Sequence, residues 1–541
     1  MYLFDNPVLQ RELLVNLRMT RAFVLLFFYN AALGATVYFA WPQSQQIDIT
    51  NPTAAIKLVN MFFLGQFLLA SLMSPSFAAA AITGEKERMT YEMLLASPMQ
   101  PGAIVLGKLL ASLCHLSLLI FSSLPIVMIC LPLGGTSPYE VLAVYFAIFL
   151  SIVTFGMISL ACSSYFRRTA AALVVSYLII LPLALFEVLF WNLFEGAGAT
   201  VRLFLTFTLL PMVCVMAWAA LFAVTSARLL HPPDVGAEGK DVVDEEQELH
   251  QAVGLVIRRD QFPDKLFAPA KRTDLLEDGA NPVYDKEMRS EIFSQGTLML
   301  RVVIQVSMLL AIPLMAGCLY IWPENAPWYI GYVVLFNMLV GPVFSAGSVT
   351  SERERQTLEL LLTTIISPGK ILWGKLISGL RVSSVLTMFL VWPLLLACVM
   401  VSDYWGNLIS VLGYVVIVLV TCLTTATVAL FCSVFFRKTS VALMTAYLAV
   451  VVLFALPLAA KYFADVFFAG TPTQELAQNA TFISPIGAAF ALPLELARGD
   501  ADNNPGDWPV FLGFLAFYGV LNAAMLSTMS WLFHTRWRVA Y

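Results

Sequence analysis

Charged residues are scarce in this sequence: Asp, Glu, Lys and Arg make up 12% of its 541 residues, whereas hydrophobic residues make up 59%. Soluble domains carry about 25% charged residues, so this chain has too little polar surface to cover a water-soluble fold. It contains instead repeated apolar runs about twenty residues long, enough for a helix to cross a hydrocarbon core about 30 Å thick. Backbone polar groups must pair internally there, which favours helices. The composition predicts an all-α integral membrane protein.

Patterns typical of metal sites and catalytic centres are also missing. The eight cysteines all fall in predicted spans without a C-x-x-C pair, which indicates packing residues and no zinc site or disulfide framework. The four histidines are far apart. His115 lies in a predicted span, but Val382 occupies the corresponding position of the second half, so we interpret His115 as a packing residue. The sequence therefore predicts no enzyme, no metal and no bound cofactor.

Twelve apolar runs predict twelve transmembrane helices. Lys and Arg gather in alternate connecting segments, the pattern of loops that stay in the cytoplasm, so both termini are predicted to be cytoplasmic. The net charge of −4 suggests no nucleic-acid partner. We place the spans at 21–41, 57–82, 104–133, 139–164, 169–194, 201–229, 297–322, 328–350, 371–401, 405–435, 439–463 and 508–533.

The two halves of the sequence repeat. GEKERMTYEMLLASPMQPGAIVLGK at 84–108 aligns without a gap with SERERQTLELLLTTIISPGKILWGK at 351–375, at a constant spacing of 267 residues. Asn6-Pro7-Val8 with Glu12 recurs as Asn281-Pro282-Val283 with Glu287, Phe166-Arg167-Arg168-Thr169 recurs as Phe436-Arg437-Lys438-Thr439, and Tyr177 matches Tyr447.

Each repeat has an even number of spans, so both copies enter and leave the membrane on the same side. We therefore expect two parallel six-helix repeats related by a pseudo-two-fold axis along the membrane normal. The predicted domains are a first repeat at 1–230, an acidic cytoplasmic linker at 231–280 and a second repeat at 281–541.

The repeated loop after the second span of each half predicts a short amphipathic helix. Thr90 and Thr357 suit an N-cap, and Glu92 and Glu359 would lie in the first turn, where the helix dipole favours negative charge. Pro101 and Pro368 would stop the helix before the next span. Met93, Leu94 and Leu95, or Leu360, Leu361 and Leu362, would give it an apolar side. An interfacial helix resting on lipid headgroups is the alternative interpretation.

These two loops resemble the coupling helices of the type-2 ABC exporter permeases. The residues that carry the likeness are GEKERMTYEMLL, which is followed by SP, PG and GK, and SERERQTLELLL, which is followed by SPG and GK. The opening NPVLQRELLVNLRMTRAF is similar to the multicopper-enzyme-maturation branch of that family. One departure is that Met89 and Gln356 stand where the family usually has glycine before the threonine.

The resemblance covers nearly the whole chain and implies a fold and partners. Residues 85–95 and 352–362 would be coupling helices that dock into two copies of a cytoplasmic ABC ATPase subunit, with 6–18 and 281–293 as interfacial connecting helices. The implied coupling residues are Glu85, Glu87, Arg88, Thr90, Glu92, Leu94 and Leu95 in the first repeat, and Glu352, Glu354, Arg355, Thr357, Glu359, Leu361 and Leu362 in the second.

The family also implies short re-entrant helices on the outer side, near 187–203 and 465–500. The alternative interpretation of their acids is that they are ordinary loop residues. The implied location is a bacterial cytoplasmic (inner) membrane, with the bilayer and accessory periplasmic or membrane proteins as further partners. The acids concerned are Glu187, Glu195, Asp465, Glu475 and Glu495.

Two G-x-x-x-x-G-K matches, at 102–108 and 369–375, imitate phosphate-binding loops. A working loop needs Ser or Thr next, to hold Mg²⁺, and a preceding strand. Leu109 and Leu376 follow instead, and each match opens an apolar span. We therefore interpret the glycines as sites of close helix packing and expect ATP and Mg to be bound by the partner ATPase.

Two rival functions remain open at this point. A secondary transporter of six-plus-six architecture fits the span count, but the loop lacks that family's G-x-x-x-D-R/K-x-G pattern, and Glu187 is the clearest intramembrane acid for ion coupling. A membrane module that anchors an ATPase without transport is the second. The apolar span interiors suit lipids, hydrophobic drugs or polymers, without choosing among them.

Overall fold

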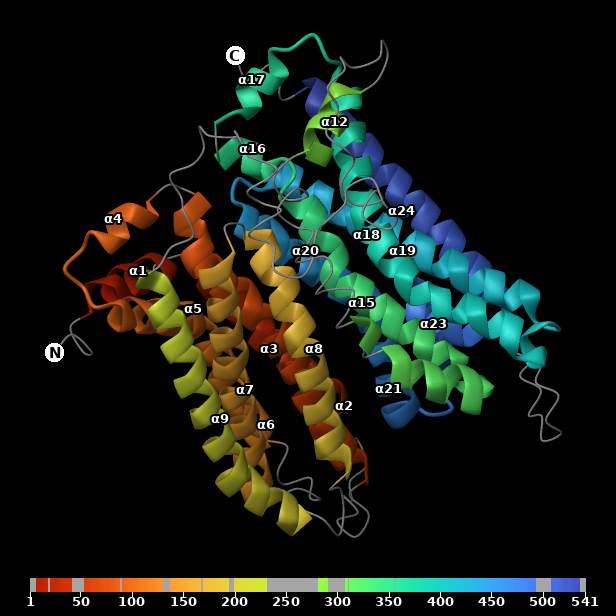
Figure 1. The fold of residues 1–541 in the computed structure, drawn as a ribbon. Helices are drawn as coiled ribbons and strands as arrows, with labels where there is room; N and C mark the ends of the chain where they lie inside the picture. The colour runs from red at the N-terminus through yellow and green to blue at the C-terminus, as the bar shows by residue number, and fades with distance from the viewer. Residues whose placement is uncertain are drawn as a thin grey trace. The chain divides into compact units, whose positions relative to one another are not determined.

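The computed structural model describes most of the predicted spans (Figure 1). Within the described residues the regular structure is helical, and no strand occurs among them. The all-α prediction is therefore confirmed. The described residues are 6–17, 20–40, 53–87, 90–129, 137–166, 169–193, 199–230, 281–289, 307–309, 311–354, 356–492 and 507–535.

The chain divides into two compact units, one of Met1–Pro233 with Phe463–Ala469 and the other of Asp234–Tyr462 with Gly470–Tyr541. The predicted linker at 231–280 lies outside the described residues, so the boundaries at 1–230 and 281–541 stay a prediction. The helices of the first repeat are α1 (Pro7–Leu17), α2 (Thr20–Ala40), α3 (Thr53–Glu87), α4 (Tyr91–Leu95), α5 (Pro101–Ser122), α6 (Leu124–Ile129), α7 (Pro138–Tyr165), α8 (Thr169–Leu193) and α9 (Ala199–Leu230).

The second repeat follows the same order. It begins at α12 (Pro282–Arg289), and short π and 3₁₀ segments, η3 (Ala316–Ile321) and η4 (Pro323–Asn325), precede its long helices. The remaining elements are α15 (Ala326–Ala346), α16 (Thr350–Glu354), α17 (Leu358–Leu362), α18 (Pro368–Met400), η5 (Ser402–Tyr404), α19 (Leu408–Phe435), α20 (Thr439–Phe454), α21 (Leu456–Phe467), α22 (Pro472–Asn479), η6 (Ala480–Ile483), α23 (Pro485–Ala491) and α24 (Trp508–Thr535).

Among the residues that the structure describes, 9 helical stretches are long and apolar enough to cross a membrane. Two further predicted spans, 21–41 and 169–194, coincide with α2 and α8. The span at 297–322 lies partly outside the described residues, so the total of twelve stays a prediction. The stretches are Leu58–Glu87, Pro101–Ile129, Pro138–Tyr165, Thr200–Leu229, Pro323–Glu354, Pro368–Met400, Leu408–Phe435, Val441–Phe467 and Trp508–Phe533.

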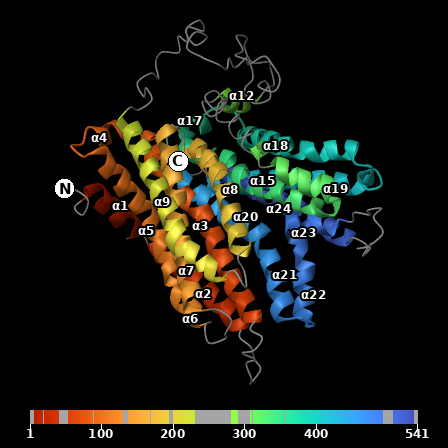
Figure 2. The ribbon, with the colours of Figure 1, turned by 60° about the horizontal axis from the view of Figure 1, so that its bottom comes forward.

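Both units pack their spans in the same way (Figures 1 and 2). In the first, α3 packs against α7, α5 and α8, and α7 also contacts α9. In the second, the corresponding α15 packs against α19, α18 and α20, and α19 contacts α24. The amino-terminal helices α1 and α12 lie against α5 and α18. The span that leads into the repeated loop thus packs against three other spans in each unit, and we call it the central span.

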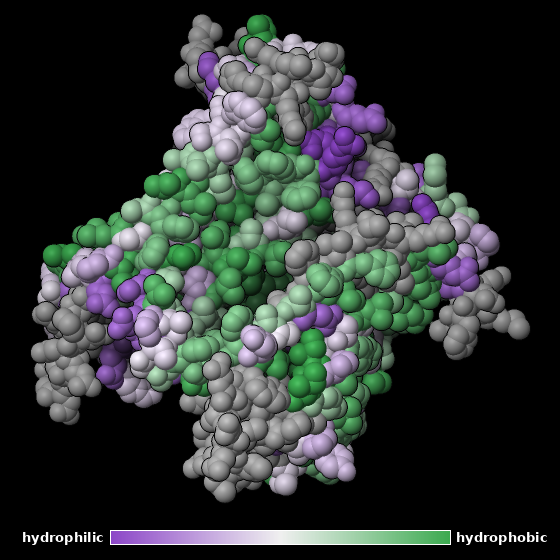
Figure 3. Space-filling model, turned by 180° about the vertical axis from the view of Figure 1, so that it is seen from behind, coloured by the Kyte–Doolittle hydropathy of each residue, from purple (hydrophilic) through white to green (hydrophobic). Residues whose placement is uncertain are grey.

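Large apolar side chains are exposed along the outer faces of these helices. Phe186, Trp392 and Trp531 expose 67%, 63% and 63% of their surface. Figure 3 shows apolar residues over much of one face of the molecule. A water-soluble protein rarely exposes so much apolar surface, whereas lipid chains cover it without cost. The surface therefore agrees with a multi-pass membrane protein.

A buried amide joins three spans of the second unit. Asn337 on α15 donates to Ser383 Oγ at 3.1 Å and to Thr387 Oγ1 at 3.0 Å, both on α18, and its Oδ1 accepts from Thr425 Oγ1 on α19 at 2.9 Å. Because the side chain is 1% exposed, no water competes for these bonds. The amide therefore fixes the register of three apolar helices.

We expect Asn337→Leu to destabilise the second unit by about 1–2 kcal/mol, since polar contacts between membrane helices contribute up to about 1.7 kcal/mol each. Thermal unfolding in detergent measures the change. Ser527→Ala is the matched control, because its exposed hydroxyl bonds only to the Ala524 carbonyl of its own helix. Equal unfolding temperatures for the two variants would show that the amide has no such role.

Candidate functional site

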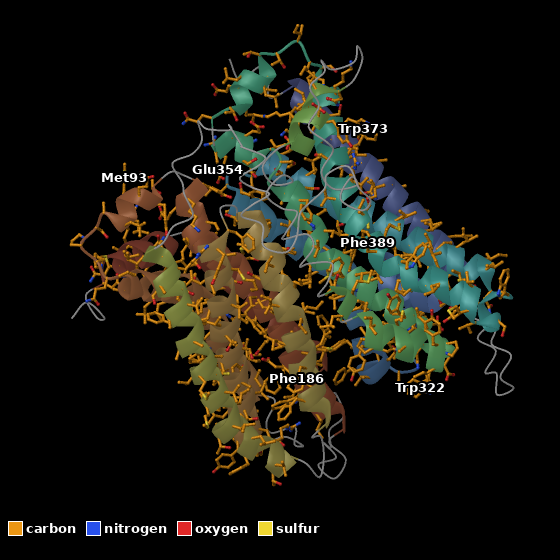
Figure 4. The ribbon with its side chains drawn as sticks, in the orientation of Figure 1. Met93, Phe186, Trp322, Glu354, Trp373 and Phe389 are labelled. Atoms are coloured by element: carbon orange, nitrogen blue, oxygen red, sulfur yellow. The ribbon has the colours of Figure 1, made fainter. Side chains whose placement is uncertain are left out.

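Each unit carries a five-residue helix at the repeated loop. In α4, Tyr91 is buried while Glu92 and Met93 are exposed; in α17, Leu358 is buried while Glu359 and Leu360 are exposed. Met93 and Leu360 expose 76% and 68% of their surface. Figure 4 shows Met93 projecting outward from α4. The two repeats therefore present the same pair, an acid followed by a large apolar side chain.

The undersides of the two short helices also match. Leu94 and Leu95 pack against the apolar core of the first unit, and Leu361 and Leu362 pack against a core cluster of the second. Tyr91 donates to the Leu229 carbonyl at 3.3 Å, and burial raises the pKa of its phenol, which keeps it protonated. The predicted apolar side is thus present at these four leucines, whereas Met93 and Leu360, which the prediction also placed on it, are exposed.

The short helices are shorter than the predicted ranges 85–95 and 352–362. Glu85 and Glu87 belong to the last turn of α3, and Glu352 and Glu354 belong to α16. Arg88 and Arg355 lie outside the described residues. The acids stay with the preceding helix because their carboxylates bind groups on neighbouring spans, as shown below.

The two threonines do not cap as predicted. Thr90 and Thr357 occupy the N-cap positions, but neither side chain accepts a bond from its helix. Both backbones are in the αR region instead of the extended conformation of a capping residue. Each hydroxyl donates to a carboxylate, Glu85 for Thr90 and Glu352 for Thr357. This charge-assisted bond orients each hydroxyl toward the carboxylate, and from the αR backbone its oxygen accepts no bond from the helix N–H groups.

The prediction that Pro101 and Pro368 end the short helices is wrong. The short helices end at Leu95 and Leu362, before either proline is reached. Pro101 and Pro368 are the first residues of α5 and α18. A proline fits there because the first N–H of a helix has no partner and its fixed φ suits the helix. They start the next span and do not stop the short helix.

A buried lysine lies beneath each short helix, and we call Lys108 and Lys375 the anchor lysines. Lys108 Nζ lies 3.2 Å from Glu85 Oε1 and 3.9 Å from Glu12 Oε1. Lys375 Nζ lies 2.6 Å from Glu287 Oε1 and 3.7 Å from Glu352 Oε1. Their side chains are only 3% and 0% exposed.

Each anchor lysine therefore joins three segments. One carboxylate comes from the amino-terminal helix, α1 or α12, and the other from the end of the central span. That second carboxylate also accepts the hydroxyl of the threonine at the start of the short helix. Because the lysine is shielded from water, its ion pairs are little screened, and losing one charge would leave the others unbalanced.

An asparagine holds each amino-terminal helix beside its anchor lysine. Asn6 caps α1 by accepting from Val8 N at 3.0 Å and donates to the Ala103 carbonyl at 2.6 Å. Asn281 accepts from Val283 N at 3.1 Å and donates to the Lys370 carbonyl at 2.8 Å.

The glycine before each anchor lysine makes room for this asparagine. A Cβ on Gly107 or Gly374 would lie 2.8 Å or 3.0 Å from the asparagine Nδ2. The second glycine and the lysine of each G-x-x-x-x-G-K match are thus explained by helix packing and ion pairing, whereas a Cβ on Gly369, the first glycine of the second match, would meet nothing within 4 Å.

The end of each central span is also tied to the corner between the fourth and fifth spans. Lys86 Nζ donates to the carbonyls of Ser163, Ser164 and Phe166 at 2.7–3.0 Å. Arg353 donates in the same way to Val434 and Phe436.

The adjacent acid caps the fifth span in each unit. Glu87 Oε1 accepts from Thr169 N at 2.8 Å, and Glu354 accepts from Thr439 N at 3.2 Å. A carboxylate at a helix N-terminus is favourable because it faces unpaired N–H groups. Glu354 is labelled in Figure 4.

Sequence reasoning placed the coupling role on the loop and missed the residues that support it. Lys108, Lys375, Glu12 and Glu287 were seen to recur, but their pairing was not predicted. The available signal was their recurrence in both halves as charged residues beside apolar spans. Within the part of the chain that the structure describes, no cluster of His, Cys, Asp or Glu is arranged to hold a metal ion.

The other predicted acids lie apart from this site. Glu187 is on α8 and accepts from Ser151 Oγ at 2.7 Å, Asp465 is on α21, and Glu475 is on the exposed α22. Glu195 and Glu495 lie outside the described residues, as does the side chain of His115. Whether the segments near 187–203 and 465–500 re-enter the membrane stays a prediction.

We expect Lys375→Met to destabilise the second unit by about 3–5 kcal/mol, because removing one partner of a buried ion pair leaves uncompensated charge. Glu287 would lose its bond to the buried ammonium, and Glu352 would keep the ion pair that it makes with the exposed Lys286 at 2.6 Å. The unfolding temperature and the protease sensitivity of α12 measure the effect. Lys370→Met is the control, since Lys370 is on the same helix but exposed. A loss no larger than that of the control would contradict the anchoring role.

Comparison with known proteins gives one family. A family model described as ABC-2 family transporter protein matches residues 11–209 and 243–535, which is most of both repeats. No curated protein matched the sequence. The family match does not distinguish the multicopper-enzyme-maturation branch, which stays a prediction. Because the match covers well over half of the chain, the protein belongs to the ABC-2 transporter family and is a membrane permease component of an ABC transporter.

Proposed function

We propose that this chain couples ATP hydrolysis by separate ATPase subunits to export of a substrate across the cytoplasmic membrane. The observation that carries the proposal is the matched pair of short helices, α4 and α17. Each has a buried first residue, an exposed acid and an exposed large apolar residue. Two equivalent projections suit a partner that offers two equivalent sockets, which favours two copies of one ATPase subunit.

The residues exposed on α4 and α17 indicate which groups the docking site on the ATPase must provide. Met93 and Leu360 would enter an apolar pocket, and Glu92 and Glu359 would meet a cation at its rim. An exposed large apolar side chain occurs at this position in both repeats, and its burial by a partner would contribute roughly 1.5–3 kcal/mol to binding. Within the part of the predicted coupling set that the structure describes, Glu92 and Glu359 would then bind the partner, and the acids, threonines and leucines beneath them would support the short helices.

The support below each projection suits the transfer of force. A force applied to α4 would be transmitted from Thr90 to Glu85 through their hydrogen bond. From Glu85 it would pass through Lys108 to α5 and α1. The same route in the second unit runs through Thr357, Glu352 and Lys375. ATP and Mg would be bound by the ATPase, and none of the coupling residues would contact them. To drive the permease from 1:99 to 99:1 between two arrangements, ATP binding must favour one of them by roughly 5.5 kcal/mol.

The proposal includes a topology. The loops at α4 and α17 and both termini would lie on the cytoplasmic side of a bacterial inner membrane. We expect Met93→Cys and Leu360→Cys, in a background without the native cysteines, to react with a membrane-impermeant maleimide only after the cells are opened. Tyr139→Cys, exposed at the start of α7, is the control that should react in intact cells. Labelling of positions 93 or 360 in intact cells would refute this topology.

Charge reversal tests the partner. Glu92→Lys with Glu359→Lys should weaken co-purification with a candidate ABC ATPase subunit by at least about tenfold, equivalent to roughly 1.4 kcal/mol. ATP hydrolysis stimulated by the permease in proteoliposomes should fall with it. Glu475→Lys is the matched control, an exposed acid on α22 outside both loops.

The outcomes separate the candidate functions. Unchanged association in the doubly reversed protein would refute the coupling role of α4 and α17. Normal association with ATP turnover but without substrate movement into vesicles would identify an ATPase anchor. Movement that persists without ATP and collapses with the ion gradient would identify a secondary transporter.

A further inference from the structure

The central span of each unit contains a proline at the same place. Pro75 lies inside α3 and Pro342 inside α15, and they are separated by the repeat spacing of 267 residues. A proline inside a helix removes one N–H donor, and its ring pushes away the carbonyl four residues earlier. Sharp bends in helices occur mostly at such prolines, so Pro75 and Pro342 mark the place where a bend in the central span is expected. The residues that follow lead directly to the acids above α4 and α17.

In both units a tyrosine from the fifth span donates a hydrogen bond to a backbone carbonyl in the turn before the proline. Tyr177 on α8 donates its hydroxyl to the Leu72 carbonyl at 2.6 Å, and Tyr447 on α20 donates to the Leu339 carbonyl at 2.5 Å. Both carbonyls belong to the residue three positions before the proline, one residue after the carbonyl that the proline deprives of its N–H partner. In the first unit Ser76 Oγ also donates to the Leu72 carbonyl, at 2.9 Å, and lies 2.7 Å from the phenol oxygen. The tyrosines are 2% and 3% exposed, so water cannot replace the phenol. In a membrane, neighbouring helices must supply such partners for backbone groups near a proline.

Beyond the proline, the central span is bound to a different part of the unit. Ser163 Oγ accepts from Thr83 N at 2.9 Å, and Ser433 Oγ accepts from Thr350 N at 3.1 Å. These bonds, with those of Lys86 and Arg353 described above, join the distal segment to the corner between the fourth and fifth spans. The distal segment, that corner and the short helix therefore form one body on the far side of the bend.

The two units differ at this bend. In the first, α3 continues past Pro75 without a break to Glu87. In the second, α15 ends at Ala346, four residues after Pro342, and the helix resumes as α16 at Thr350. Equivalent segments with the same ties thus differ in their helical structure after the proline.

We propose that Tyr177 and Tyr447 are positioning residues that set the bend at Pro75 and Pro342. Each phenol joins the proximal half of the central span to the fifth span, whose first turn is itself tied to the distal half. A displacement of α4 or α17 then changes the bend and moves the spans. Without the phenol, the turn before the proline absorbs the displacement locally. The inference rests on the proposed function for the source of the movement, but the bend and its tyrosine do not.

The first experiment needs no ATPase. Amide hydrogen exchange of the purified permease is compared for wild type, Tyr447→Phe and Tyr518→Phe. Tyr518 is an equally buried tyrosine in the same unit, and its hydroxyl donates to the Ile483 carbonyl at 2.7 Å, away from α15. Tyr447→Phe should accelerate exchange at least several-fold in residues 338–350, and Tyr518→Phe should leave that segment unchanged. Equal exchange in the two variants would overturn the proposal.

A second variant distinguishes a hinge from simple packing. Pro342→Ala restores the missing N–H and removes the ring, so the turn can form its helical hydrogen bond without help from the phenol. In the Pro342→Ala background, adding Tyr447→Phe should have little further effect on exchange in residues 338–350. If the tyrosine merely fills space, its replacement would accelerate exchange equally in both backgrounds, and the hinge would be excluded.

The third experiment measures coupling in proteoliposomes with the ATPase. Tyr177→Phe with Tyr447→Phe should bind the ATPase as wild type does but should lower permease-stimulated ATP hydrolysis several-fold, while Tyr518→Phe should not. Normal stimulation in the double variant would overturn the positioning role. Failure of wild type itself to bind an ATPase would refute the proposed function instead, and the exchange experiments would still decide whether the tyrosines set the bend.

Discussion

The ammonium group buried beneath each short helix holds the amino-terminal helix, the central span and the next span of its unit together. Lys108 and Lys375 each contact a carboxylate from an amino-terminal helix and another from the central span. Burying one such charge in a low-dielectric region is unfavourable unless its partners are in place. The amino-terminal helix, the central span and the next span must therefore assemble together. The short helix, which is too short to be stable alone, then rests on a finished base.

The membrane explains why this base is built from charge and glycine and not from a larger apolar core. Lipid chains are as apolar as leucine, so apolar burial does little to bring one span against another. Close backbone contact and buried polar bonds supply specificity instead. Gly107 and Gly374 admit an asparagine, and Asn337 joins three spans of the second unit. The exposed apolar surface is left for lipid.

Much of this structure was predictable because one rule, the length of an apolar run, fixes most membrane helices. The repeat located the functional loop, since the same polar residues recur at a constant spacing. What the sequence did not predict is which partners the polar groups choose. Thr90 looks like a helix cap, and only the position of Glu85 in space shows why its hydroxyl turns to a carboxylate. The pairing of Glu12 with Lys108 likewise joins residues far apart in the chain.

Comparison of the two repeats separates what coupling requires from what packing allows. The anchor lysines, their carboxylates, the prolines and the tyrosines above them occur in both units. The buried amide of Asn337 has no equivalent in the first unit, because Ala70 occupies that position. The pair of Arg202 with Glu140, at 3.4 Å, has no equivalent at the start of α24, where the sequence has no arginine. Features shared by diverged halves mark the path from the short helix to the central span. Features found once belong to the separate stability of each half, which is free to change as long as that path is kept.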